Sequence, residues 1–119
     1  MYNRTLKNSL ENKINKGKAI ILIGPRQVGK TTLIKAVIHT KKHLFLDGDD
    51  STVRNLLNSP NTEQIKSIIG SNKLVFIDEA QRIEGIGLTL KIITDQFKDV
   101  QLLVVVHRLS IYQVHLTNL

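Results

Sequence analysis

A glycine-rich stretch directly after the apolar run 19–23 is the part of this sequence best suited to chemistry. It reads Gly24-Pro25-Arg26-Gln27-Val28-Gly29-Lys30-Thr31-Thr32 and fits the pattern G-x-x-x-x-G-K-[ST]. A loop of this pattern carries the chain from a strand into a helix, and its backbone N–H groups surround a nucleotide phosphate. We therefore predict that residues 24–32 bind the phosphates of a nucleotide.

Individual positions of this loop serve different purposes in phosphate binding. Glycine at positions 24 and 29 permits the tight turn, and a side chain at Gly29 would crowd the phosphate. Lys30 is expected to bridge the β- and γ-phosphate oxygens, and Thr31 is placed to give its hydroxyl to a Mg²⁺ ion. The predicted cofactors are therefore a nucleotide and Mg²⁺.

A second motif is the run Leu74-Val75-Phe76-Ile77-Asp78-Glu79, in which four apolar residues end in two carboxylates. Such a run is typical of a strand buried on both faces. Its acidic end would lie at the carboxyl edge of the sheet, where open α/β sheets place their ligands. We expect Asp78 to hold the Mg²⁺ shell and Glu79 to orient and polarise an attacking water. The alternative for this run on its own is a buried strand followed by a solvated acidic turn.

Composition limits the class of protein. The 119 residues, 41% of them hydrophobic, are enough for one small domain over 1–119. The absence of cysteine excludes a disulfide framework, a thiolate zinc site and a cysteine nucleophile, and it fits a reducing cytoplasm. Residues 1–18 are polar and no apolar run approaches about 18 residues, so we expect a cytoplasmic protein without a membrane span.

The net charge of +7 raises the question of nucleic acid binding. The basic residues are scattered, and only three Phe and two Tyr are available for base stacking. A solvated basic face whose field attracts ATP is the simpler explanation. His39 and His43 have the i, i+4 spacing of helical metal ligands, but two intervening lysines and no nearby Cys or carboxylate argue against zinc there.

Periodicity and turn signals predict alternating helices and strands, and hence an α/β fold with a mostly parallel sheet and helices on both faces. Residues 47–51 form a turn that caps a helix running to about Leu57, and the calcium-loop alternative fails on ligand spacing. Asn61 and Gln64 have the positions of a capping box, and Gly70 ends that helix. The expected strands are 19–23, 43–46, 74–77 and 101–106. Three further helices are expected: one over 3–16, one after the phosphate loop, and one whose apolar face carries Ile86, Leu90, Ile93 and Phe97.

The motifs together resemble a known family, the prokaryotic AAA-superfamily P-loop ATPases. The signature of that family runs much like GPRQVGKTTL, then a DGDD-type turn, then a strand closing on DEAQRI. This chain has the corresponding residues in the same order at 24–33, 47–50 and 78–83, so the resemblance covers nearly the whole chain.

The resemblance implies a three-layer P-loop fold of the additional-strand type, with strand 101–106 between strands 19–23 and 74–77. It also implies ATP as the nucleotide, Asp78 on Mg²⁺ and Glu79 as the base that activates water. The implied nucleotide-binding core is 18–106, followed by a tail at 107–119, and the C-terminal domain of the larger family members is expected to be missing.

One departure from the family concerns its γ-phosphate sensor. Strand four of the family usually ends in Thr-Gly-Ser-Ser, whereas this chain reads Val106-His107-Arg108-Leu109-Ser110. A pair of compensating frameshifts would explain the difference. The alternative is that His107 or Arg108 replaces the sensor.

A second departure concerns the edge of the sheet. With Leu119 soon after the fourth strand, strand 19–23 is expected at an uncovered edge, which would invite a homo-oligomer or a protein partner. Alternatively, the imperfectly alternating segment 111–116 folds back and covers that edge.

Three classes of function compete. The first is an ATP-hydrolysing switch in which Glu79 positions water for an unidentified partner. The second is a module that binds ATP with no significant turnover, because no arginine finger or lid completes its site. The third is a P-loop kinase of a small molecule. We expect an ATPase with low intrinsic activity, and steep salt dependence would reveal a nucleic-acid partner.

Overall fold

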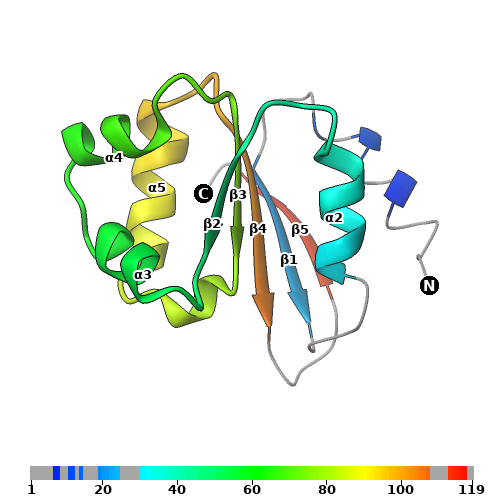
Figure 1. Cartoon of the computed structure of the whole chain (residues 1–119), viewed down its shortest axis with the longest axis horizontal. Coiled ribbons are helices and arrows are strands. Elements are labelled where there is room, and N and C mark those ends of the chain that lie inside the picture. Colours follow the sequence, from blue (N-terminus) through cyan, green and yellow to red (C-terminus); the bar gives the residue numbers. More distant parts are fainter. Residues whose placement is uncertain are drawn as a thin grey trace.

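The computed structural model describes residues 7–8, 11–12, 14, 19–24, 30–107 and 113–117. The elements are β1 (Ala19–Gly24), α2 (Lys30–Ile38), β2 (Leu44–Asp47), α3 (Ser51–Leu57), α4 (Thr62–Ile69), β3 (Leu74–Asp78), the 3₁₀ helix η1 (Ala80–Arg82), α5 (Ile86–Gln96), β4 (Gln101–His107) and β5 (Gln113–Thr117). Figure 1 shows a sheet with α2 on one face and α3, α4 and α5 on the other. The three-layer α/β fold predicted from the sequence is confirmed.

The sheet has the strand order β2-β3-β4-β1-β5. The first four strands are parallel, and β5 runs antiparallel to β1. The last strand of the parallel set, β4, therefore lies between β3 and β1, as the family resemblance implied. This order places the carboxyl ends of β1, β3 and β4 side by side at one edge of the sheet.

The central strands are continuously apolar, and successive side chains point to opposite faces, so both faces of the sheet need helices to cover them. Phe76 of β3 and Leu103 of β4 belong to the cluster that packs under α2, whereas Val75 and Leu102 belong to the cluster under α3, α4 and α5. The buried members of the α2 cluster are Ile14, Ile20, Leu22, Leu33, Ile34, Ile38, Leu74, Phe76, Leu103 and Val105. The central strands are thus buried on both sides and cannot slip by one residue without exchanging the two cores.

Most of the predicted elements lie within one or two residues of the observed ones. Asp50 caps α3 by accepting from the backbone N–H of Thr52, and α3 ends at Leu57. The predicted helix 3–16 falls mostly outside the described residues. None of the helices in the described part of the chain is long and apolar enough to cross a membrane.

The expected uncovered edge at strand 19–23 is wrong. Strand β5 pairs with residues 19–23 of β1, from Ala19 opposite Thr117 to Ile23 opposite Gln113. The alternative, in which segment 111–116 folds back on this edge, is the one that the structure adopts. A partner at this edge therefore has no support from unpaired backbone groups of β1.

An exposed ion pair joins the start of β3 to the turn before β4. The Lys73 ammonium hydrogen-bonds the Asp99 carboxylate, and this bond, with the attraction between the charges, holds the pKa of Asp99 below its usual value. A lowered folded-state pKa means that the contribution to stability is present at neutral pH and is lost as the pH falls through that pKa. Because both side chains are about two-thirds exposed, the contribution is small.

The first testable prediction concerns the cap of α4. Asn61 Oδ1 accepts from the Gln64 N–H and Gln64 Oε1 accepts from the Asn61 N–H, both at 2.8 Å, which is the predicted capping box. Asn61→Ala removes an acceptor for an orphan N–H group and should lower the free energy of unfolding by about 1 kcal/mol. Ser67→Ala, an exposed change in the same helix, is the control for urea denaturation. Equal stability of the two variants would contradict this account of the cap.

Candidate functional site

The predicted phosphate loop is anchored at both ends by regular structure. Strand β1 ends at Gly24 and helix α2 begins at Lys30, so the loop connects a strand to a helix N-terminus as predicted. Residues 25–29 lie outside the described residues, and the predicted contacts of these residues stay predictions. In the parallel register Gly24 lies opposite His107, which places the end of β4 directly beside the loop entrance.

Thr31 and Asp78, predicted as ligands of one ion, lie side by side. Thr31 Oγ1 donates a hydrogen bond of 3.0 Å to Asp78 Oδ2, although the residues are 47 positions apart in the chain. The other carboxylate oxygen of Asp78 accepts from the backbone N–H of Glu79 at 2.9 Å. A hydroxyl and a carboxylate oxygen in contact form the hard oxygen pair that suits Mg²⁺, and the residues present fit that ion.

Glu79 occupies an unusual backbone conformation at the end of β3. Its φ of 53° and ψ of 42° lie in the left-handed region, which few residues other than glycine adopt. This turn stops the strand, starts η1 and leaves Glu79 only 3% exposed. Backbone strain of this kind costs on the order of 1 kcal/mol or more, and it persists where the surrounding structure fixes it. The strain therefore supports a functional reason for the position of the Glu79 carboxylate.

Two residues outside the predicted catalytic, phosphate-binding and metal-binding residues contact this carboxylate, and one of them is the candidate sensor His107. Gln81 Nε2 donates to Glu79 Oε1 at 2.8 Å, and His107 Nδ1 lies 2.8 Å from Glu79 Oε2. Gln81 Oε1 also accepts from the backbone N–H of His107 at 3.1 Å, so its amide joins η1 to the end of β4. The sequence named His107 as a candidate sensor but not as a neighbour of Glu79, which its position at the carboxyl end of a strand next to β1 and β3 could have indicated. Arg108, the other candidate sensor, lies outside the described residues.

The DGDD turn, residues 47–50, contacts the backbone and side chains of the 78–83 motif. The Gly48 N–H donates to the backbone carbonyl of Asp78 at 2.8 Å, and the Asp49 carboxylate pairs with Arg82 at 2.7 Å. Arg54 adds hydrogen bonds to the carbonyl oxygens of Gly48 and Asp49. These contacts explain why the 47–50 and 78–83 motifs occur together, since each fixes the backbone of the other.

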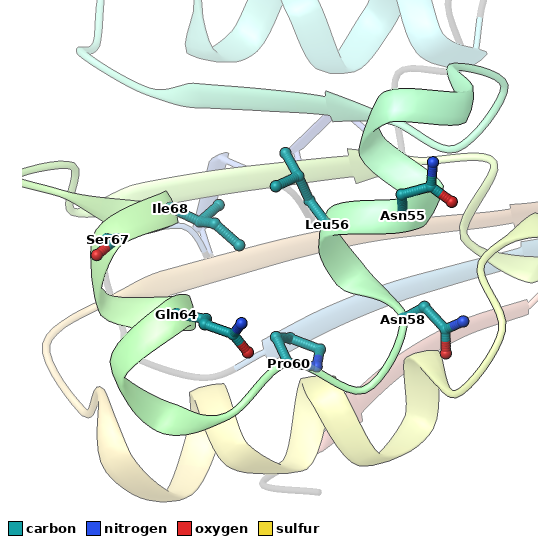
Figure 2. Close-up of a pocket in the computed structure, with 7 residues that line it drawn as sticks. All are labelled: Asn55, Leu56, Asn58, Pro60, Gln64, Ser67 and Ile68. Carbon is teal, nitrogen blue, oxygen red and sulfur yellow. The ribbon is translucent and has the colours of Figure 1, made fainter.

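A separate cavity of about 320 Å³ lies between α3 and α4. Its lining residues are Asn55, Leu56, Asn58, Pro60, Gln64, Ser67 and Ile68 (Figure 2). None of these side chains is charged, so this cavity offers no counter-charge for a nucleotide phosphate. The candidate site is therefore the edge where β1, β3 and β4 end.

Comparison with known proteins places most of this chain in a recognised class. A family model described as an AAA domain matches residues 16–106. The uncharacterized proteins Mb2031c of Mycobacterium bovis and Rv2008c of Mycobacterium tuberculosis are each 30% identical over 87 residues, which is 73% of this chain and 19% of theirs. The Fe(3+) ions import ATP-binding protein FbpC 1 of Pectobacterium atrosepticum is 38% identical over 58 residues, which is 45% of this chain and 16% of that protein. The chain thus spans less than a fifth of the length of these relatives.

The second prediction tests the contact between the two motifs. A Cβ at Gly48 would lie 2.1 Å from the backbone oxygen of Glu79, a distance that requires the backbone to move. Gly48→Ala should therefore lower the free energy of unfolding by about 1–3 kcal/mol and displace the 78–79 turn. Gly87→Ala is the matched control, because a Cβ there meets nothing within 4 Å and alanine favours helix α5. Urea denaturation distinguishes them, and similar stability of both variants would refute the proposed close approach.

Proposed function

Because the chain belongs to the AAA domain family, a class of nucleotide-binding P-loop domains, we propose that it binds ATP with Mg²⁺ and hydrolyses it slowly as a switch for a partner. The observation that carries this proposal is the hydrogen bond from Thr31 to Asp78. It brings the first turn after the phosphate loop to the acidic end of the neighbouring buried strand. The similarity to an ATP-binding protein of Pectobacterium atrosepticum supports ATP as the nucleotide.

Each residue of the proposed site has one task. Residues 24–30 hold the phosphates, with the amino end of α2 adding its positive dipole end. Thr31 and Asp78 hold Mg²⁺, which supplies positive charge to the phosphate oxygens when it is bound. Glu79 orients water for attack, and its nearly complete burial strengthens its interaction with that water.

Binding without significant turnover is the second candidate function, and one observation favours it. Both carboxylate oxygens of Glu79 have neighbours, Gln81 on one and His107 on the other. These neighbours take up part of the acceptor capacity of the carboxylate and compete with a water that would hydrogen-bond to it. Slow hydrolysis, or none, is the expected result for the chain alone.

The proposed switch would act on a partner, and the proposal specifies this partner only as a client protein or a nucleic acid. The matched relatives are more than five times as long as the shared region, so their remaining parts contain most of their sequence. Loss of the γ-phosphate would change the contacts of Glu79 and His107, and a client protein or nucleic acid bound near this edge of the sheet would respond to that change. A small-molecule kinase remains an alternative, but the geometry of the described residues adds no support for it.

The third prediction separates phosphate binding from hydrolysis. Lys30→Ala should weaken ATP binding at least tenfold, because it removes the proposed contact with the β- and γ-phosphates. The exposed Lys41→Ala variant is the matched control for loss of a positive charge. Isothermal titration with Mg²⁺ and ATP measures both dissociation constants, and equal affinities would refute the role of Lys30.

The fourth prediction concerns Glu79 alone. Glu79→Gln keeps the size of the side chain but removes the base, so phosphate release should fall by a factor of about 10²–10⁴ while ATP affinity stays within about threefold. Phosphate release by the unaltered chain, measured beside this variant, decides between the two candidate functions. If the unaltered chain binds ATP but releases phosphate no faster than Glu79→Gln, the chain is a binding module.

A further inference from the structure

The end of β4 brings a histidine to the two carboxylates of β3. Asp78, Glu79 and His107 each offer one ligand atom, and these atoms all lie within 4.8 Å of one another. The side chains of Glu79 and His107 are 3% and 8% exposed. The group is therefore a compact and nearly buried set of two carboxylates and one imidazole.

The imidazole nitrogen in this cluster is poorly satisfied. His107 Nδ1 is buried and, among the described residues, makes no well-directed hydrogen bond, although Glu79 Oε2 lies only 2.8 Å away. A buried polar atom without a directed partner costs free energy, and it marks a place where a further group would be stabilised. The nitrogen lies beside the carboxylates and is therefore aimed into the cluster.

We propose that Asp78, Glu79 and His107 bind a divalent transition-metal ion, with Zn²⁺ as the representative, in the absence of nucleotide. Mixed imidazole and carboxylate ligands suit Zn²⁺ and Co²⁺, whereas Mg²⁺ prefers oxygen ligands alone. The charge of such an ion offsets the charges of two carboxylates that are nearly buried, Asp78 and Glu79.

The separations suit a small ion after modest side-chain movement. A tetrahedral ion with bonds of about 2.0–2.2 Å places its ligand atoms roughly 3.3–3.6 Å apart. One pair, Glu79 Oε2 and His107 Nδ1, is already closer, at 2.8 Å, and no ligand atoms are more than 4.8 Å apart. Rotation of the longer side chains changes these distances without moving β3 or β4, and water can supply the fourth ligand.

Neighbouring groups already orient the proposed ligands. Thr31 donates to one oxygen of Asp78, and Gln81 donates to one oxygen of Glu79, which leaves the other oxygen turned toward His107. Hydrogen bonds of this kind fix ligand carboxylates in metal sites and raise affinity. The ion would occupy the carboxylate that water positioning requires, so we expect it to inhibit ATP hydrolysis by the proposed site.

The test uses the chain treated with a chelator, without nucleotide. Isothermal titration with Zn²⁺ should show one ion per chain, and Co²⁺ should give a visible absorption band of a low-coordinate site. His107→Ala should weaken Zn²⁺ binding at least tenfold, because it removes the nitrogen ligand. The partly buried His43→Ala is the matched histidine control and should bind Zn²⁺ as the unaltered chain does. Excess Mg²⁺ should displace little of the bound Zn²⁺.

Two further variants make the result decisive. Glu79→Gln, which keeps the side-chain shape, should also weaken Zn²⁺ binding, and it serves in place of His107→Ala if that variant fails to fold by circular dichroism. Lys30→Ala should keep Zn²⁺ binding while losing ATP, so a failure of the metal site is distinguishable from a failure of the proposed nucleotide site. Absence of Zn²⁺ binding, or equal binding by the unaltered chain, His107→Ala and Glu79→Gln, would overturn the proposal and leave only a contact between His107 and Glu79.

Discussion

Two carboxylates buried at the end of β3 impose the constraint on which the rest of the site depends. A buried charge without partners costs several kcal/mol, so every element that reaches this edge must supply a donor or make room for a cation. Helix α2 supplies the hydroxyl of Thr31 and η1 supplies the amide of Gln81, and β4 places the imidazole of His107 2.8 Å from Glu79. Within the described residues, the neighbours of the two carboxylates thus come from three different elements that meet at this edge.

The strand order makes that meeting possible. Placing β4 between β1 and β3 puts the phosphate-loop entrance, the acidic pair and residue 107 on three adjacent strands. Two apolar cores hold these strands from opposite faces, so the register of one strand against the next is strongly specified. The DGDD turn then fixes the position of the turn at residues 78–79 through Gly48. The backbone of Gly48 lies so close to the backbone oxygen of Glu79 that only a glycine fits without movement. Stability and site geometry thus depend on the same contacts.

The sequence was sufficient to predict features that depend on local pattern or on the rule for parallel strands. The capping box at Asn61 and Gln64 follows from spacing alone, and the approach of Thr31 to Asp78 follows from strands ending at one edge. The contacts of Gln81 and His107 could not be derived in this way. They require the left-handed backbone at Glu79, which turns its carboxylate toward β4, and no propensity predicts that conformation for glutamate. Strand β5 was only one of two alternatives, because its alternation of apolar residues is weak.

Position 107 carries the main chemical difference from the related family pattern. A hydroxyl or amide sensor can respond to a γ-phosphate by donating one hydrogen bond, whereas an imidazole can also gain a proton or coordinate a metal. His107 Nδ1 lies 2.8 Å from an oxygen of the buried Glu79, the same oxygen that water or a cation would approach. In the proposed function, where Glu79 orients water, the contact with His107 would therefore affect whether the Glu79 carboxylate is available to that water. Gln81 hydrogen-bonds both the Glu79 carboxylate and the backbone N–H of residue 107. A small movement of β4 would therefore change the contacts of the Glu79 carboxylate.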